Sequence, residues 1–260
     1  LLVPKGQSKP LQVRSFEYSA DNQKVLIYTN TQRVWRQDTK GDYWILDMAT
    51  KNLKQLGTKF PASTMMFAKI SPDSKKVAYV QAHNIYVEDI ASGAITPLTT
   101  DGDSRLINGT FDWVYEEELG LRNGFRWSPD SNSVAYWQID TEGVKDFLIT
   151  SSSDGPYPKL ITFGYPKTGE KNPAAKIGVV SAKGGDTTFL QIPGDSRDHY
   201  LAKMDWVDDS VVLQQFNRLQ NKNTVMIADP KTGKCNNILV ETDKAWVEND
   251  NEFLWINKNQ

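Results

Sequence analysis

Three consecutive glutamates, Glu116, Glu117 and Glu118, are the residues of this 260-residue sequence whose spacing points most directly to chemistry. They directly follow an aromatic cluster in the stretch FDWVYEEELG (111–120). Adjacent carboxylates raise one another's pKa unless a cation lies between them. A primary ammonium group, which has three hydrogen-bond donors, satisfies two carboxylates well. The run therefore needs either open solvent or a cation, together with an element that holds it in place.

Three interpretations of the glutamate run stay open from the residues alone. The run is a solvated acidic turn, a Ca²⁺ site to which Asp101 and Asp103 add oxygen ligands, or a site for a cation of the protein or of a ligand. On a helical turn, neighbouring side chains are about 100° apart, so two carboxylates converge only near an end or a bend. We expect Trp113 and Tyr115 to anchor such a turn and to keep the carboxylates in place.

Other nucleophiles and metal ligands are sparse in the sequence. It has two histidines, His83 and His199, for which we expect structural or solvent-exposed roles, with His199 in a turn. It has no G-x-S-x-G nucleophile elbow. The single cysteine, Cys235, has no second thiol for an intramolecular disulfide or a metal site. We therefore expect no metal, no cofactor and no catalytic residues in this chain, which should hydrolyse nothing unaided.

Composition restricts the partners of the chain. Lys and Arg (30) nearly balance Asp and Glu (32), and the net charge is −2, so nothing indicates binding to nucleic acid or to an anionic membrane. No apolar run approaches the roughly 20 residues of a membrane helix. The start, LLVPKGQSKP, lacks an initiator methionine and a signal-peptide pattern, so we expect the chain to be part of a longer protein.

The elements that must position the glutamates come from an internal repeat. FEYSADNQKVLIY (16–28), FAKISPDSKKVAYV (67–80) and FRWSPDSNSVAYWQ (125–138) are variants of one phrase, and MDWVDDSVVLQQF (204–216) is a fainter copy with a shorter turn. In each phrase an aromatic residue opens a strand, a turn built on Ser and Asp follows, and an alternating apolar strand leaves. A second pair of strands follows each phrase, which makes four antiparallel strands per repeat.

Four strands per repeat of about 40–50 residues predict an all-β chain, a β-propeller of four-stranded antiparallel blades. A β-sandwich with coincidental turns is the alternative. We expect four blades and the opening of a fifth, within a larger propeller. The expected blades span residues 10–60, 64–99, 124–195, 200–241 and 244–260. Two parts of the chain are additions to the four-stranded repeats: the glutamate-bearing segment 100–123 and the extra length of the third blade. Insertions into a repeat scaffold often carry function.

These motifs resemble those of one family. DWVYEEE, followed shortly by FRWSPDSNSVAYWQID, is similar to the propeller of the dipeptidyl-peptidase IV family, serine exopeptidases of the prolyl oligopeptidase clan. Three further segments also resemble that family, and the resemblance covers essentially all 260 residues. These segments are TQRVWRQDTKGDYWILD (31–47), GYPKTGEKNPAAKIGVV (164–180) and FNRLQNKNTVMIADPKTGKC (216–235).

The resemblance implies roles for individual residues. Glu117 and Glu118 would bind the free α-ammonium of a peptide substrate, and Glu116 would support them. Arg36, of the tryptophan–arginine pair, would contact the carbonyl between the first two substrate residues. Residues 141–163 would form an extended arm used in a homodimer. The family's propeller has eight blades and caps an α/β-hydrolase domain, so this chain would hold about four to five blades and would lack the hydrolase domain.

The function that the resemblance implies is substrate recognition in an enzyme that releases N-terminal X-Pro or X-Ala dipeptides. Peptides with a blocked N-terminus should then be rejected. A tripeptide-releasing peptidase of the same family and a non-catalytic binding or scaffold propeller are the alternatives. The resemblance also implies a periplasmic, extracellular or membrane-associated location.

Overall fold

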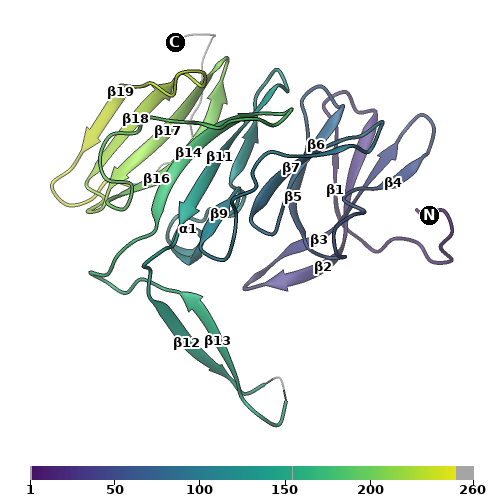
Figure 1. Ribbon diagram of the computed structural model, residues 1–260, viewed down its shortest axis with the longest axis horizontal. Coiled ribbons are helices and arrows are strands. Elements are labelled where there is room, and N and C mark those ends of the chain that lie inside the picture. Colours follow the sequence, from purple (N-terminus) through teal and green to yellow (C-terminus); the bar gives the residue numbers. More distant parts are fainter. Residues whose placement is uncertain (1, 154, 250–260) are drawn as a thin grey trace. The chain divides into compact units, whose positions relative to one another are not determined.

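Strands make up nearly all of the regular structure in the computed structural model, which describes residues 2–153 and 155–249 (Figure 1). The prediction of an all-β chain with antiparallel four-stranded units is confirmed. The start of the expected fifth blade, 244–260, lies largely outside the described residues. The chain divides into two compact units, which are residues 1–102, 127–134 and 180–186, and residues 103–126, 135–179 and 187–260.

The first two repeats form one hydrogen-bonded sheet of eight strands, in which β4 pairs with β3. Its strands are β1 (Val13–Tyr18), β2 (Lys24–Val34), β3 (Gln37–Asp47), β4 (Leu53–Gln55), β5 (Met65–Ile70), β6 (Lys76–Gln81), β7 (Asn84–Asp89) and β8 (Ile95–Pro97). The two repeats join where β3 pairs with β5 through Lys40 with Met66 and Gly41 with Met65. Val77 and Tyr79 alternate along β6, and both lie in the core of this sheet.

The third repeat forms a sheet in the order β10-β11-β14-β15, and β9 also pairs with β11. Its strands are β9 (Leu106–Asn108), β10 (Phe125–Trp127), β11 (Ser133–Asp140), β14 (Ala174–Ser181) and β15 (Thr188–Phe189). The segment 100–123 therefore contributes a strand to this sheet, and it also carries the helix α1 (Trp113–Glu118). That strand and the helix are the two elements that place the glutamates.

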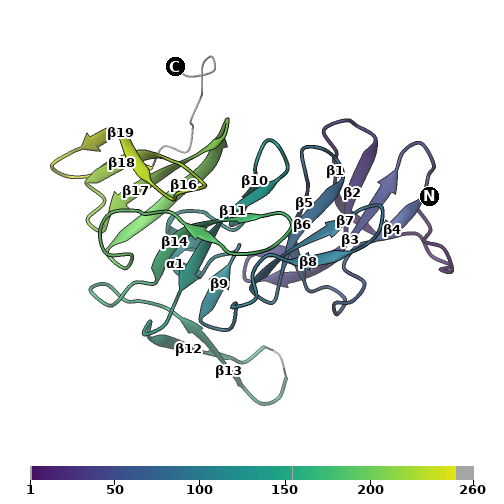
Figure 2. The same cartoon turned by 45° about the horizontal axis from the view of Figure 1, so that its top comes forward.

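A two-stranded hairpin interrupts the third repeat between β11 and β14. It consists of β12 (Asp146–Ser151) and β13 (Lys159–Gly164), and we call residues 146–164 the hairpin arm. The pairing puts Phe147 opposite Phe163 and Ile149 opposite Ile161, so these four apolar side chains share one face. Figures 1 and 2 both show the arm leaving the end of the third sheet.

The fourth repeat forms a regular four-stranded sheet in chain order. Its strands are β16 (His199–Val207), β17 (Ser210–Asn217), β18 (Lys222–Ala228) and β19 (Cys235–Thr242). The expected shorter turn is confirmed, because Val207 pairs with Ser210 and Asp208 takes a φ of 47°. One hydrophobic core runs through the third and fourth repeats, and the indole N–H of Trp137 donates to the carbonyl of Leu201 at 2.9 Å.

A Ser-x-Asp turn recurs with the same hydrogen bonds in the first three repeats. The serine Oγ donates to the aspartate Oδ1 at 2.6 Å in Ser19–Asp21, Ser71–Asp73 and Ser128–Asp130. The same hydroxyl accepts the backbone N–H five residues after the serine, at 2.9, 3.0 and 2.9 Å respectively. The repeated phrase is therefore a repeated hydrogen-bonding unit that closes the turn between two strands.

We predict that Ser71→Ala destabilises the fold much more than Ser92→Ala. Ser71 is 1% exposed, and its loss leaves the amide of Lys76 and the carboxylate of Asp73 without that partner, which costs about 1–3 kcal/mol. Ser92 donates to Asp89 at 2.7 Å in an exposed turn, where water replaces it at a cost of a few tenths of a kcal/mol. Urea unfolding of both variants measures the difference, and equal costs would contradict this account.

Candidate functional site

The glutamate run forms the C-terminal half of α1, a six-residue helix in which Glu116 still belongs to the first turn. Asp112 caps the N-terminus of α1, because its carboxylate accepts the N–H groups of Val114 and Tyr115 at 3.3 Å each. The chain leaves the helix through Gly120, whose φ of 67° suits glycine because it has no Cβ. The carboxylates therefore lie at a helix end, one of the places where neighbouring side chains can converge.

Tyr115 fixes the buried side of α1. It is 1% exposed, and its hydroxyl accepts the backbone N–H of Leu201 at 3.1 Å. Its ring stacks on Phe111 at a centroid distance of 5.5 Å, and Phe111 meets Trp137 edge-on at 5.3 Å. These contacts tie the helix to the core of the third and fourth repeats.

Trp113 contacts a residue that sequence reasoning did not single out. Its ring lies 4.1 Å from the ring of Tyr165 between centroids, at an interplanar angle of 49°. Nothing near Trp113 in the sequence signals this partner, because Tyr165 follows the hairpin arm much further along the chain. Asp112 was also missed, although an aspartate directly before a helical turn is a readable N-cap signal.

The three glutamates differ in exposure. Glu116 and Glu117 are half-buried, whereas Glu118 is exposed. Burial raises the pKa of Glu116 to about 7; the charge of Arg122 opposes this rise, whereas the charge of Asp112 adds to it. Glu116 is therefore only partly ionised at neutral pH, which reduces the repulsion within the run.

Glu117 and Glu118 lie at the carbonyl end of α1. The carbonyl end of a helix carries partial negative charge and unsatisfied acceptors, so acidic side chains there are unfavourable. The last turn of α1 contains no basic residue. Because a primary ammonium offers three donors to nearby oxygens, this helix end is chemically suited to bind one.

Arg36 lies in the two-residue turn that joins β2 to β3, and its side chain is exposed. The preceding Trp35 is 49% exposed and has a φ of 54°, which is an uncommon backbone conformation for a bulky residue. Arg36 belongs to the first compact unit and α1 to the second, so a joint action of Arg36 and the glutamates stays a prediction.

The structure gives little support to the Ca²⁺ interpretation. Within residues 2–153 and 155–249, no three His, Cys, Asp or Glu side chains cluster so as to hold a metal ion. Asp103 instead accepts the N–H groups of Arg105 and Leu106 at 2.7 Å each, which closes a local turn.

His199 is the first residue of β16, so its expected place in a turn is wrong. It is 5% exposed, and its ring nitrogens lie 2.9 Å from Nε2 of Gln215 and 3.2 Å from the carbonyl oxygen of Ala175. Burial lowers the pKa of His199. These contacts give the histidine a structural role.

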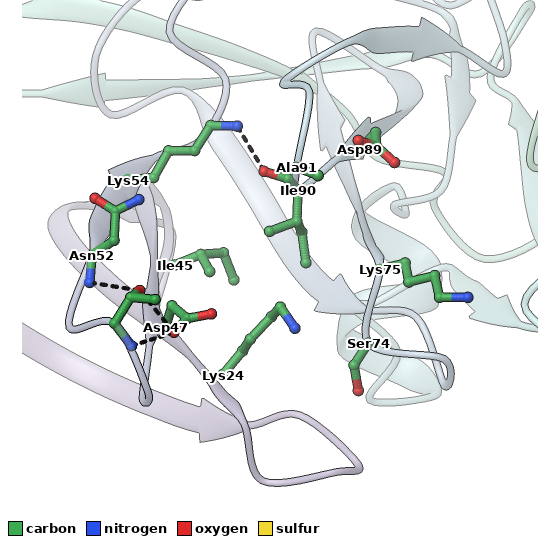
Figure 3. A pocket seen from close by; sticks show the side chains of 11 residues that line it. Lys24, Ile45, Asp47, Asn52, Lys54, Ser74, Lys75, Asp89, Ile90 and Ala91 are labelled. Carbon is green, nitrogen blue, oxygen red and sulfur yellow. Dashed lines mark hydrogen bonds between the residues drawn. The ribbon is translucent and has the colours of Figure 1, made fainter.

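A cavity of about 390 Å³ lies at the turns of the first two repeats, and no predicted site residue lines it (Figure 3). Three of its five charged side chains form hydrogen bonds within the local structure. Lys54 donates to the carbonyl of Ile90 at 2.8 Å, and Asp47 and Asp89 accept N–H groups of their own turns at 2.8 Å. This cavity therefore does not belong to the glutamate site.

Comparison with known proteins finds similarity to one group of peptidases along nearly the whole chain. The family model described as the dipeptidyl peptidase IV (DPP IV) N-terminal region matches residues 19–260. Dipeptidyl aminopeptidase B of Saccharomyces cerevisiae is 32% identical over 99% of this chain and 32% of that protein. A probable dipeptidyl-aminopeptidase B of Penicillium rubens is 30% identical over 88% of this chain and 28% of that protein. The resemblance inferred from the motifs is confirmed.

A solved structure agrees with the fold. The crystal structure of Porphyromonas gingivalis dipeptidyl peptidase 4 matches 94% of this chain and 34% of its own, with a TM-score of 0.86 and 27% identity. The β-propeller prediction is thereby confirmed. The chain spans about a third of the length of these relatives. Among the described residues, no helix is long and apolar enough to cross a membrane.

We predict that Asp112→Asn stabilises the fold in a pH-dependent way. Burial raises the pKa of Asp112 from 3.8 to about 6, against the opposing effect of the N–H groups that it accepts. Between about pH 4 and 6 the folded chain keeps a proton that the unfolded chain has released, so Asp112 lowers stability as the pH rises. The variant keeps the capping oxygen without the charge. It should match the wild type near pH 4 and exceed it by about 2–3 kcal/mol above pH 6.5.

Urea unfolding at both pH values measures this gain. Asp103→Asn is the matched control, because Asp103 also accepts two backbone N–H groups but is exposed. A gain for Asp112→Asn that does not change with pH would contradict the burial of a charged carboxylate at this position.

Proposed function

This chain belongs to the family of dipeptidyl peptidase IV N-terminal regions, and from that premise we propose that it is the substrate-recognition part of an exopeptidase. The enzyme releases dipeptides, X-Pro or X-Ala, from peptides with a free N-terminus. Relatives over nearly the whole chain are named dipeptidyl aminopeptidases, which supports this reaction class. Cleavage itself is assigned to an α/β-hydrolase domain outside this chain, because the sequence has no G-x-S-x-G motif.

In this proposal Glu117 and Glu118 bind the α-ammonium group of the substrate. The observation that carries it is the position of both carboxylates at the carbonyl end of a short helix whose last turn has no basic residue. An ammonium group at this position would be bound through charge-assisted hydrogen bonds to the two carboxylates. Glu116, with its pKa near 7, supports the pair without adding a full third charge.

The proposed site measures a substrate from its N-terminus. A carboxylate pair on an anchored helix accepts a free amine, and an acylated N-terminus offers neither the charge nor the three donors. Arg36 is assigned to the carbonyl between the first two substrate residues. A peptide with a blocked N-terminus would cover the two carboxylates without supplying a cation, which costs free energy. Blocked peptides are therefore rejected.

The hairpin arm is assigned to a homodimer interface. One face of the arm carries Phe147, Ile149, Ile161 and Phe163, and the first three are 38–42% exposed. The opposite face also exposes two apolar side chains, Leu148 and Leu160. Exposed apolar side chains favour a protein partner; a second copy is the partner proposed, bound by the face with the two phenylalanines and two isoleucines. We place the protein outside the cytoplasm, in the periplasm or the extracellular space.

The first prediction from this proposal concerns the amine. We expect the intact gene product to release p-nitroaniline from Gly-Pro-p-nitroanilide and to leave the N-acetylated form uncut. Glu117→Gln/Glu118→Gln should lower kcat/KM at least about 30-fold, since truncating one side of a desolvated charge pair costs about 2–5 kcal/mol. Glu142→Gln/Glu241→Gln makes the same charge change at two exposed positions and should be silent.

The other outcomes of this assay are also informative. Cleavage of both substrates would contradict the proposed amine site. Release of a tripeptide from longer peptides would assign the tripeptidyl activity of the same family instead. No cleavage by a well-folded protein would favour a non-catalytic binding or scaffold propeller.

The second prediction concerns the arm. Ile149→Asp/Ile161→Asp places two charges on the apolar face and should convert the dimer to monomers in analytical ultracentrifugation. Thr150→Asp/Thr162→Asp adds the same charges to the opposite face and should leave the dimer intact. A dimer that survives the isoleucine substitutions would exclude this face as the interface.

A further inference from the structure

We infer that Tyr165 is a positioning residue of the amine site and connects the hairpin arm to the glutamate helix. The inference rests on the proposed function, and it assigns a role to a residue outside the glutamate motif. It depends on the path of contacts from the arm to α1, and all of its residues belong to one compact unit.

Tyr165 contacts the glutamate helix through the ring of Trp113. The two rings are 4.1 Å apart between centroids, and both side chains are half-buried. Trp113 is the first residue of α1, so its ring contact constrains the start of the helix that carries Glu117 and Glu118. An aromatic pair of this kind contributes about 0.5–1.5 kcal/mol beyond the area that it buries, which corresponds to a two- to twelvefold change in an equilibrium.

Tyr165 directly follows the arm and is joined to it by its backbone and by its ring. Its N–H donates to the carbonyl of Lys145 at 3.0 Å, which continues the pairing of β12 with β13 by one residue. Its ring lies 5.5 Å from Phe147 and 6.1 Å from Phe163. A continuous row of rings therefore runs from the apolar face of the arm to Trp113.

The base of the arm is clamped, so Tyr165 has a fixed support. Both terminal nitrogens of Arg105 donate to Asp146 at 3.1 Å, in a bidentate pair that fixes direction as well as distance. Lys145 forms an ion pair with Glu170 at 2.8 Å. The first pair fixes the start of β12 at Asp146. The second pair joins Lys145, which precedes β12, to Glu170, which follows β13.

The helix needs this second support because it is short. A six-residue helix is not stable alone, and packing determines its orientation. Asp112 caps the N-terminus of the helix, and Tyr115 anchors its buried side. Trp113 packs against Tyr165 at the base of the arm. Loss of the Tyr165 ring therefore leaves the helix in place but less constrained, and the carboxylates less well aimed at the amine.

The experiment compares Tyr165→Leu with Tyr165→Phe in the intact gene product. Leucine keeps an apolar side chain without the ring, and phenylalanine keeps the ring. We expect Tyr165→Leu to raise KM for Gly-Pro-p-nitroanilide about three- to tenfold with kcat within twofold, and Tyr165→Phe to restore wild-type KM. Tyr157→Ala, an 84% exposed residue of the arm, is the control for general damage to the arm and should be silent.

Two further measurements separate this inference from the proposed function. Hydrogen exchange of the peptide 111–121, followed by mass spectrometry, should speed up in Tyr165→Leu and not in Tyr165→Phe. In the Glu117→Gln/Glu118→Gln background, Tyr165→Leu should change KM no further. Unchanged exchange in Tyr165→Leu overturns the inference whatever the kinetics show, and an equal KM effect in both backgrounds overturns it too. Faster exchange with kinetically silent glutamate variants overturns the proposed function alone.

Discussion

The hydrogen bond from the Leu201 amide to the Tyr115 hydroxyl is the contact on which the candidate site most depends. It joins a six-residue helix, which has little stability of its own, to the first core strand of the next repeat. The stacked ring of Phe111 and the cap from Asp112 complete this anchor. Because the helix is fixed from its buried side, three carboxylates can be presented at its free end without the chain rearranging to separate them.

Two acidic groups of the glutamate helix and its cap are buried or half-buried, and their burial affects their ionisation. Asp112 and Glu116 both have raised pKa values, to about 6 and about 7, mainly because burial disfavours their charged forms. The site thus concentrates acidic groups where water is partly excluded, which is typical of functional sites. In the proposed function that ligand is the amine of a peptide, and the hairpin arm supplies the second support of the helix through Tyr165.

Local patterns predicted the fold well and the site only in part. The Ser-x-Asp phrase revealed the repeat because its first three copies use the same short-range hydrogen bonds, as at Ser71 and Asp73. The pairing of β3 with β5 at Gly41 and the Tyr165–Trp113 contact join residues far apart in the chain, and no local pattern encodes them. His199 was misplaced for a similar reason, since its burial depends on Gln215 and Ala175 from two other strands. The roles of Glu117, Glu118 and Arg36 came from the family resemblance, and from chemistry alone the cation stayed unspecified.

Binding of a free α-amine by the glutamate helix is the basis of the proposed function. Competition by dipeptides that resemble the product tests this binding most directly. The inhibition constants of Val-Pro and N-acetyl-Val-Pro would be measured against Gly-Pro-p-nitroanilide with the intact gene product. The account predicts that acetylation weakens inhibition by at least about a hundredfold, because it removes the charge that the carboxylates neutralise. Equal inhibition by the two dipeptides would show that the glutamates do not bind the amine.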